Sequence, residues 1–460
     1  MNTTSIREIA KATDGRIIKG SEELTVSGVV HDSRECGPDD LFVCVIGENL
    51  DGHDFIPQVI EAGCRALLVS NEGVAEAASD ASVILVDDTV KAMDDLARWY
   101  LEKLDLITVA VTGSVGKTST RDMIYYVLNE KFKCGRNMKN YNNEIGLPLS
   151  IFRLDDSNEA VVLEMGMSDF GEISLLTDIA RPMIGVITNI GTAHMEHLGS
   201  REGIFRAKME ITEGLRSRAE GGAMVVAFDE EFLNPERIAG DFDSIFIGSD
   251  GRSSYIVGDI VDEGIDGVSF SLEHREERRD FNVPVPGRHN AVNASLAIAI
   301  GDRLGLTTEQ IRKGLSAVEL TGHRLRVLRT EDLTVIDDTY NASPDSMKSG
   351  LKVLERSRCS GCRVAILGEM YELGEKEDQM HRDVGIFAAG CDIDRVIGIG
   401  PLAKNITDGA AAGGMEALWY ETKDDLYREM SEHVGDGDIV LVKASRGMRL
   451  EEVVEKLTEE

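Results

Sequence analysis

The sequence lacks any apolar run long enough to cross a membrane, and its start lacks the apolar core of a signal peptide. Basic residues are also few, because 49 Lys and Arg stand against 82 Asp and Glu and the formal net charge is −33. Such an acidic surface repels phosphate backbones and anionic lipids, which argues against nucleic acid as a partner and against membrane insertion. We therefore expect a cytoplasmic protein in which an anionic nucleotide needs a local site of backbone N–H groups, basic side chains and metal ions.

Cysteines are few and do not form a disulfide framework. There are seven, scattered along the chain, which fits a reducing compartment. Cys359 and Cys362 form a C-x-x-C in a Ser-Gly turn, and without a second pair we do not interpret it as a metal or redox site. Prolines number only 9, whereas 46 glycines and 42% hydrophobic residues are typical of a globular protein. At 460 residues the chain is long enough for roughly two to four domains.

Short apolar runs alternate with helical patterns, which predicts α/β domains with parallel sheets. In the last part of the chain we expect strands at 334–338, 363–367, 395–399, 417–420 and 438–442, with helices at 345–356 and 402–412. A second unit begins with a strand at 106–112, a helix at 117–129 and strands at 160–164 and 185–188. The first hundred residues have their own short strands and then a helix, at 26–31, 41–45, 66–69, 82–86 and 89–103. We place the three domains at 1–103, 104–318 and 319–460.

The most specific motif is the glycine turn from Gly113 to Thr118, between a predicted strand and a predicted helix. Such a turn surrounds an anion with backbone N–H groups, while Lys117 reaches the β- and γ-phosphates and the Thr118 hydroxyl holds Mg²⁺. A generic P-loop has a glycine where this chain has Val111, so only the shorter form Gly-x-x-Gly-Lys-Thr fits. The alternative is a glycine turn followed by an accidental Lys-Thr pair.

Three more residues are candidates at the same edge of the sheet, and each has a structural alternative. Glu164 ends a predicted strand, where a carboxylate holds Mg²⁺ or is simply solvated. His194 follows another strand, although a lone His is more often structural. Lys208 lies in a helical segment, where a solvated face with Glu partners is the simpler interpretation. These residues alone do not separate a switch, a motor, a kinase or a ligase.

Taken together, the motifs resemble the Mur ligase family over nearly the whole chain. Seven segments in order carry the resemblance, namely Thr112–Thr118, Asn140–Pro148, Glu164–Gly166, Asn189–His194, Ala207–Glu210, Pro286–Asn290 and Asp337–Ala342. The resemblance implies a UDP-sugar-binding domain at 1–103, a central ATP-binding P-loop domain at 104–318 and a C-terminal Rossmann-like domain at 319–460 for the incoming substrate.

The resemblance also implies roles for single residues. ATP would be bound by Gly113, Ser114, Val115, Gly116, Lys117, Thr118, Ser119, Asn290, Arg324 and Asp338, with Asn293 as a weaker candidate. Two Mg²⁺ ions would be held by Thr118, Glu164, His194 and a carbamylated Lys208. The catalytic residues would be Lys117, Lys208, His194 and Arg324, and the substrate-binding residues Ser33, Arg34, Asn140, Asn143, Tyr340 and Asn341. The alternative for Asn290 and Asn293 is capping of the helix through Ala299.

Within the family, four features are similar to the member that adds D-alanyl-D-alanine to UDP-N-acetylmuramoyl-tripeptide. They are the segments Asn140–Pro148, Gly368–Gly374 and Lys443–Arg446 together with His381. The resemblance therefore implies an ATP-dependent ligase of peptidoglycan synthesis that forms an acyl phosphate and acts as a monomer in cell-wall growth and cell division. The Asp-Asn-Pro-Arg motif of the diamino-acid-adding relative is not found. Two alternatives stay open: a pseudomurein or folyl-polyglutamate ligase, and a nucleotide switch, although the Asn-Lys-x-Asp guanine motif of GTPases is not found either.

Overall fold

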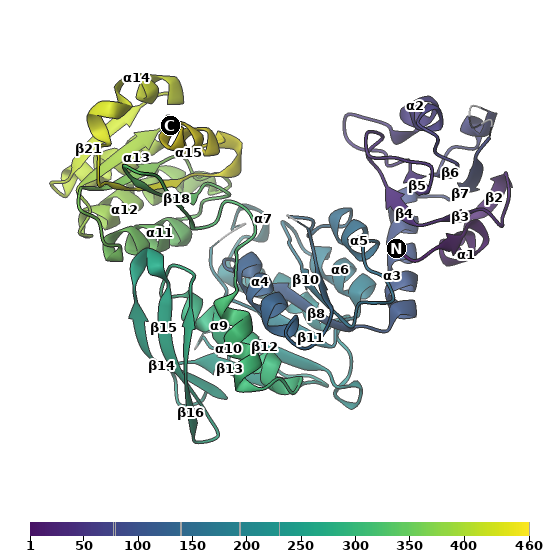
Figure 1. Ribbon diagram of the computed structural model, residues 1–460, viewed down its shortest axis with the longest axis horizontal. Helices are drawn as coiled ribbons and strands as arrows, with labels where there is room; N and C mark the ends of the chain where they lie inside the picture. The colour runs from purple at the N-terminus through teal and green to yellow at the C-terminus, as the bar shows by residue number, and fades with distance from the viewer. Residues whose placement is uncertain (77, 79, 139, 193–194, 230, 460) are drawn as a thin grey trace.

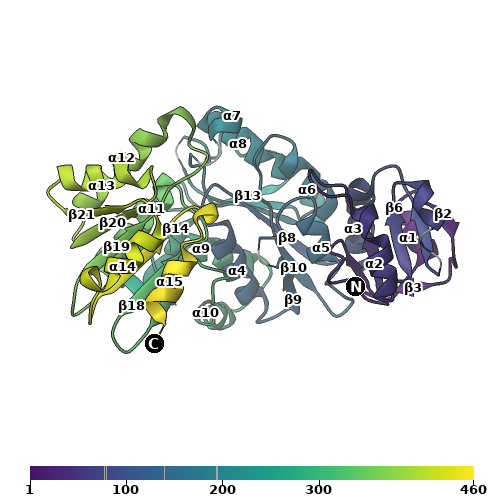
Figure 2. The ribbon, with the colours of Figure 1, turned by 90° about the horizontal axis from the view of Figure 1, so that it is seen from above.

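The computed structural model describes residues 1–76, 78, 80–138, 140–192, 195–229 and 231–459. The chain forms three α/β units, with the N-terminal and C-terminal units at opposite ends and the middle unit between them (Figure 1). Seen from above, the three units lie along the long axis of the molecule (Figure 2). In the described ranges, no helix combines the length and the apolar character that a membrane span requires.

The N-terminal unit has a five-stranded sheet in the order β2-β7-β6-β5-β4, parallel except for β2. The predicted single strand at 26–31 is wrong, because β3 pairs with β1 outside this sheet whereas β4 is its edge strand. The elements are β1 (Thr4–Ser5), α1 (Ile6–Ala12), β2 (Arg16–Lys19), β3 (Thr25–Val26), β4 (Gly28–Val30), β5 (Asp40–Val43), η1 (Gly52–Phe55), α2 (Ile56–Glu61), β6 (Ala66–Val69), η2 (Glu72–Glu76), β7 (Ser82–Leu85) and α3 (Thr89–Leu104).

The middle unit has a nine-stranded sheet in the order β16-β15-β14-β13-β12-β11-β8-β10-β9. The part of the sheet from β14 to β9 in this order, which includes β8, is parallel. Strands β15 and β16 extend the sheet as antiparallel strands, which the sequence pattern did not predict. The elements are β8 (Ile107–Thr112), α4 (Lys117–Leu128), β9 (Cys134–Arg136), α5 (Gly146–Ile151), β10 (Ala160–Glu164), α6 (Glu172–Ala180), β11 (Ile184–Ile187), α7 (Met195–Leu198), α8 (Arg201–Met209), η3 (Glu210–Thr212), η4 (Arg218–Glu220), β12 (Ala223–Ala227), β13 (Asp243–Gly248), β14 (Tyr255–Asp262), η5 (Gly264–Asp266), β15 (Val268–His274), β16 (Glu277–Val283), α9 (Asn290–Arg303) and α10 (Thr308–Ser316).

The C-terminal unit has a six-stranded sheet in the order β17-β18-β22-β19-β20-β21, parallel except for β17. All five strands and both helices predicted for this region are present to within about two residues. The elements are β17 (Arg326–Arg329), β18 (Thr334–Asp338), α11 (Pro344–Arg356), β19 (Arg363–Leu367), η6 (Gly374–Lys376), α12 (Glu377–Ala389), β20 (Arg395–Ile399), α13 (Ala403–Ala412), β21 (Glu416–Tyr420), α14 (Lys423–His433), β22 (Ile439–Lys443), η7 (Arg446–Met448) and α15 (Glu451–Thr458).

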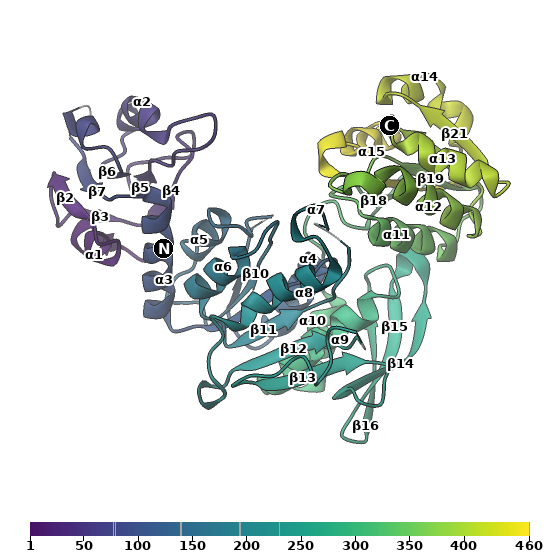
Figure 3. The ribbon, with the colours of Figure 1, turned by 180° about the vertical axis from the view of Figure 1, so that it is seen from behind.

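The N-terminal and middle units share one hydrophobic core. Side chains of α1 and α3 belong to the same buried cluster as side chains of α5, α6 and β11. Helix α3 lies between the two units (Figure 3), and its buried Tyr100 accepts a hydrogen bond from Asn2 N and donates one to Leu154 O. The C-terminal unit instead builds two clusters from its own side chains, joined from the middle unit by Ile265 of η5.

Strand β8 and its two neighbours in the middle sheet determine where the site lies. Strand β8 is almost entirely buried between β10 and β11, which is why its sequence is an unbroken apolar run. All three strands are parallel, so their carboxyl ends lie at one edge, where α4 begins directly after β8. Binding sites of open α/β sheets occur at this edge.

Candidate active site

The glycine turn after β8 is held in place by the segment that follows β11. An added Cβ on Gly113 would lie 1.9 Å from Thr188 Oγ1, so this position has no room for a side chain. Asn189 Oδ1 accepts from Val115 N at 3.0 Å, and Asn189 Nδ2 donates to Val115 O at 2.8 Å. Thr188 Oγ1 also donates to Val115 O at 2.6 Å. These bonds fix the backbone of the turn before any phosphate arrives.

Lys117 opens helix α4 and folds back over the turn. Its Nζ donates to Gly113 O at 2.8 Å, close to where the turn would hold a phosphate. Burial lowers the pKa of Lys117, and the negative charge of Glu164 opposes that shift. The negative charge of a bound phosphate would further favour the protonated form of Lys117.

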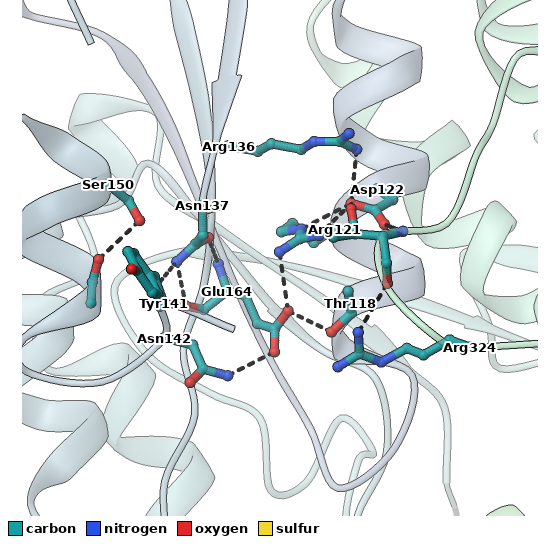
Figure 4. Close-up of polar contacts among 12 residues, drawn as sticks. Thr118, Arg121, Asp122, Arg136, Asn137, Tyr141, Asn142, Ser150, Glu164 and Arg324 are labelled. Carbon is teal, nitrogen blue, oxygen red and sulfur yellow. Dashed lines mark hydrogen bonds and ion pairs between the residues drawn. The ribbon is translucent and has the colours of Figure 1, made fainter. Parts of the chain in front are cut away.

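Glu164 is the centre of a polar cluster at the end of β10 (Figure 4). Its Oε2 accepts from Thr118 Oγ1 at 2.7 Å, and its Oε1 accepts from Asn142 Nδ2 at 2.8 Å. The guanidinium of the fully buried Arg121 lies 3.5 Å from Oε2. Burial alone would raise the pKa of Glu164, but the positive charges of Arg121, Arg324 and Lys117 outweigh it and hold the pKa below its usual value. Glu164 is therefore an anionic carboxylate, and the interpretation as a solvated strand end is wrong.

Thr118 and Glu164 offer one hydroxyl and one carboxylate, the oxygen ligands that Mg²⁺ prefers. Among the residues that the structure describes, no three His, Cys, Asp or Glu side chains gather into a metal cluster. The predicted ligand His194 lies outside the described residues. The described donors suit a Mg²⁺ ion that is completed by phosphate oxygens and water rather than an all-protein cage.

Lys208 lies on α8 with its side chain only 1% exposed, so the interpretation as a solvated face is wrong. Burial lowers the pKa of Lys208 well below its ordinary value, and the positive charge of Lys117 adds to the effect. No ion pair of Lys208 occurs within the described part of the chain. Its amine therefore gives up a proton more readily than an exposed lysine does, and the neutral amine is the nucleophilic form.

The C-terminal unit closes the site from the other side. One cavity of about 530 Å³ is lined both by the glycine turn and by Arg324, Asp338, Tyr340 and Asn341. The Arg324 guanidinium stacks on the Tyr340 ring at 3.5 Å, and Asp338 pairs with the buried Lys443 at 2.7 Å. Residues of the middle unit and of the C-terminal unit thus line the same cavity.

Some predicted residues lie away from this cavity. Asn290 Nδ2 donates to Pro286 O at 2.7 Å, and Asn293 Nδ2 donates to Asn290 Oδ1 at 2.8 Å. Neither residue caps α9, because the cap residue is His289 and no side-chain cap bond forms, so the capping alternative is wrong. Within the described ranges neither asparagine lines the cavity, and both side chains bond to protein groups instead.

The segment Asn140–Pro148 contributes differently from what its two predicted asparagines suggested. Asn143 lines the cavity and its Oδ1 accepts from Gly146 N at 2.9 Å, whereas Asn140 is exposed. Asn142, which was not predicted individually, also lines the cavity and donates to Glu164. Ser33 and Arg34 lie in the N-terminal unit, where Arg34 pairs with Asp32.

A second cavity of about 370 Å³ lies between the N-terminal and middle units. It is lined by His31 and Glu35, which flank Ser33 and Arg34 in sequence, and by Tyr141 of the Asn140–Pro148 segment. The segment thus reaches both cavities.

Three polar residues of the site were not predicted individually: Asn137, Arg121 and Asn142. Asn137 Oδ1 accepts from Glu164 N at 2.5 Å, and its Nδ2 donates to Glu164 O at 3.1 Å and to Tyr141 O at 2.6 Å. Asn142 lies inside a segment that the sequence did mark, but Arg121 and Asn137 belong to no motif. They could have been found as polar residues on a helix face or at a strand end that is otherwise apolar.

The loops around 368–374 and 443–448 form the C-terminal rim of the large cavity. Ser445 N donates to Glu369 O, and Tyr371 N donates to Ser445 Oγ, both at 2.9 Å. The buried His381 accepts from Met370 N at 2.8 Å through Nε2. His381 therefore holds the rim and does not face the cavity itself.

Fold and site define a protein that binds nucleotide phosphates between two α/β units, one of which brings an arginine to the other. Three family models match the chain: the Mur ligase family catalytic domain at residues 25–100, the Mur ligase middle domain at 111–301 and the Mur ligase glutamate ligase domain at 323–446. The UDP-N-acetylmuramoyl-tripeptide–D-alanyl-D-alanine ligase of Bacillus subtilis (strain 168) is 39% identical over 99% of this chain and 98% of its own length. The ligase of the same name from Escherichia coli (strain K12) is 32% identical over 95% of each chain.

Solved structures agree. The crystal structure of MurF from Acinetobacter baumannii matches with a TM-score of 0.91 and 27% identity over 100% of both chains. The crystal structure of the MurF ligase from Thermotoga maritima in complex with ADP matches with a TM-score of 0.81 and 29% identity over 93% of this chain and 96% of that one. The chain belongs to the Mur ligase family and is an ATP-dependent ligase.

Proposed function

We propose that this chain joins D-alanyl-D-alanine to UDP-N-acetylmuramoyl-tripeptide with ATP, completing the peptide of the peptidoglycan precursor. The observation that carries the proposal is the shared cavity in which Lys117, Thr118 and Glu164 of the middle unit face Arg324 of the C-terminal unit. The names of the Bacillus subtilis and Escherichia coli relatives support the choice of substrates over a pseudomurein or folyl-polyglutamate ligase.

In the proposed reaction, a carboxylate oxygen of the tripeptide attacks the γ-phosphorus of ATP, and the bond from that phosphorus to the β,γ-bridging oxygen breaks to release ADP. The amine of the dipeptide then attacks the acyl carbon, loses a proton and expels inorganic phosphate. Lys117 and Arg324 would neutralise charge as two anions approach one another. The protein supplies positions and charges and forms no covalent bond to the substrates.

Two Mg²⁺ ions would shield the phosphates, the first held by Thr118 and the second by His194 and a carbamylated Lys208, with Glu164 as a shared ligand. A buried Lys208 whose pKa is lowered suits carbamylation, in which the neutral Nζ bonds to the carbon of CO₂ and releases a proton. The carbamate is an anion with two oxygens, which suits a hard cation better than an amine does.

The N-terminal unit would hold the UDP-sugar through Ser33 and Arg34, with the domains divided at 103/104 and 318/319. Asn290 and its neighbours would hold adenine, although the Asn290 amide itself bonds to Pro286 O outside the cavity lining. Asp338 would hold the ribose, while Asn140, Asn143, Tyr340 and Asn341 would contact the peptide substrates. The proposal also includes a cytoplasmic monomer. The cysteines, all free, fit that compartment.

The proposal is tested by coupling ADP release to a visible readout with ATP, Mg²⁺ and purified substrates. ADP release should require D-alanyl-D-alanine together with UDP-N-acetylmuramoyl-tripeptide, and product should form in equal amount. The tripeptide ending in meso-diaminopimelate and the one ending in lysine are tested side by side to identify the third residue. Equal ADP release with free glutamate and a folate, or release without any amine, contradicts the proposal.

A further inference from the structure

The connector between the middle and C-terminal units changes its attachment within a few residues. Before Gly322 it belongs to the middle unit: Thr321 N donates to Asp122 Oδ2 at 2.7 Å, and Thr321 Oγ1 donates to Asp122 Oδ1 at 3.2 Å. Leu320 packs against the hydrophobic cluster of the middle unit. Asp122 is fully buried on α4, the helix that starts at the phosphate turn.

After Gly322 the connector belongs to the C-terminal unit. His323 Nδ1 bonds to Asp337 Oδ2 at 2.6 Å, and Leu325 N donates to Asp338 Oδ1 at 3.2 Å. Leu325 packs against a C-terminal hydrophobic cluster. Gly322 itself has φ +81°, a left-handed backbone that glycine adopts without strain. The change of attachment therefore coincides with the residue that is freest to rotate.

Asp122 is an unusually firm anchor. Besides the bonds from Thr321, its Oδ1 accepts hydrogen bonds from Arg121 Nη2 at 2.6 Å and from Arg136 Nη1 at 2.9 Å (Figure 4). Two guanidinium groups and a backbone N–H thus converge on one buried carboxylate, where hydrogen bonds to a charged group are strong. Arg121 also faces Glu164 at 3.5 Å, so the anchor is in contact with the carboxylate predicted to hold the metal.

Arg324 crosses the junction. Its backbone follows Gly322, but its Nη1 donates back to Thr321 O at 3.0 Å. Any rotation of the C-terminal unit about Gly322 changes that distance, so the place of the Arg324 guanidinium depends on how firmly Thr321 is held.

We infer that Asp122 is a positioning residue: it clamps Thr321 to the phosphate-binding helix, makes Gly322 the pivot of the C-terminal unit and thereby sets where Arg324 enters the cavity. The link to turnover rests on the proposed function. The link to the orientation of the two units does not, because that orientation is measured without substrates.

The first measurement is the distance distribution between spin labels on the two units. Labels go on exposed alanines, through Ala239→Cys in the middle unit and Ala411→Cys in α13, with Cys359→Ser and Cys362→Ser removing the two cysteines that are not buried. Asp122→Asn in this full-length background should broaden the distribution relative to the parent. A distribution as narrow as that of the parent overturns the inference.

The matched control is Asp302→Asn. Asp302 is a largely buried carboxylate of the middle unit that pairs with Arg279 at 2.5 Å and accepts from Tyr255 Oη at 3.1 Å, but it belongs to α9 and not to the connector. Its variant should keep the parent distribution. Equal broadening in both variants would mean that Asp122 acts only through general stability, and the inference fails.

The second measurement is turnover. Asp122→Asn should lower kcat about 10-fold or more below Asp302→Asn, with the KM for ATP changed by less than about 3-fold, because the phosphate turn stays in place while Arg324 is misplaced. A broadened distribution with unchanged kcat would refute the link to Arg324 and leave the proposed function intact. Absence of ligation in the parent would refute the proposed function and leave the distance test valid.

If Asp122→Asn does not fold, Thr321→Pro tests the same contact and leaves Arg121 and Arg136 paired with Asp122. Proline removes the N–H donor from the connector. The same broadening is expected, and a parent-like distribution in a folded Thr321→Pro protein overturns the inference.

Discussion

Thr118 donates its hydroxyl to Glu164 Oε2 at 2.7 Å, which joins the first turn of α4 to the end of β10. The two side chains are far apart in sequence and meet because β8 and β10 are parallel neighbours, with Glu164 in register with Val111. The bond fixes both oxygens before nucleotide arrives, so neither must be ordered when Mg²⁺ and ATP bind.

Thr118→Val should lower kcat/KM for ATP by about 100-fold, because it removes the hydroxyl and keeps the shape of the side chain. Thr118→Ser keeps the hydroxyl and should stay within about 5-fold of the parent. Steady-state ligation kinetics at several Mg²⁺ concentrations measure both variants. Equal losses in the two variants would show that the hydroxyl is not the important group.

Lys208→Ala should lose ligation by about 100-fold, because a carbamate can no longer form on the buried amine. Formate or acetate should restore part of the activity by placing a carboxylate in the space that the lysine leaves. The parent protein, titrated with the same salts, is the control and should show no stimulation. A variant that keeps full activity, or loses it without any rescue, contradicts the assignment.

Arg324→Lys should lower kcat about 100-fold while the Kd for ATP changes little, because lysine keeps the charge but loses the planar fork that stacks on Tyr340. ATP affinity is measured by calorimetry with a non-hydrolysable analogue, and turnover by ADP release. Arg326→Lys is the matched control, since Arg326 is exposed on the adjoining strand β17. A comparable loss in Arg326→Lys would point to a general effect of the connector region.

Asp94→Asn should change how stability depends on pH. Asp94 is a buried carboxyl on α3, and burial, together with the nearby negative charges of Asp95 and Glu144, raises its pKa from 3.8 to about 7. The folded state then binds the proton more tightly than the unfolded state, so this group's contribution to stability is lost as the pH rises from about 4 to about 7. Asparagine does not titrate, and from pH 5 to 8 the parent should lose at most about 3 kcal/mol relative to the variant.

Urea unfolding of both proteins at pH 5 and pH 8 measures this difference. Glu102→Gln, which neutralises an exposed carboxylate on the same helix, should follow the parent at both values. If Asp94→Asn also follows the parent, Asp94 is already ionised at neutral pH in the folded protein.

The partly exposed parallel strands β9, β13 and β14 were missed, whereas local patterns predicted strands that are buried on both faces and stand out as apolar runs. Strand β22 (Ile439–Lys443) and the strand that enters the phosphate turn, β8, are examples. The split of 26–31 into β3 and β4 was missed, since a two-residue strand leaves no periodic signal. Strand β16 (Glu277–Val283) was missed because most of its residues are charged and it therefore contains no apolar run.

At the site, motifs identified residues that line the cavity better than those that support them. Lys117 and Glu164 follow from strand ends and a glycine turn, whereas Arg121 carries no local sign that it is buried. The burial of Lys208 also depends on tertiary packing, because other side chains of α8 belong to the core that the N-terminal and middle units share. The charged residues beside Lys208 in sequence instead predicted an exposed helix face. Residues whose role depends on tertiary packing cannot be recognised from local pattern alone.

The core that the N-terminal and middle units share has a consequence for how the chain can be divided. A break in the connector at 317–320 separates a C-terminal segment with its own two clusters from a segment in which one cluster runs through both other units. A break at 103/104 would instead cut through that cluster beside Leu101 and Leu106. Two co-expressed fragments split at the connector should therefore each fold and reassemble, whereas fragments split after α3 should aggregate.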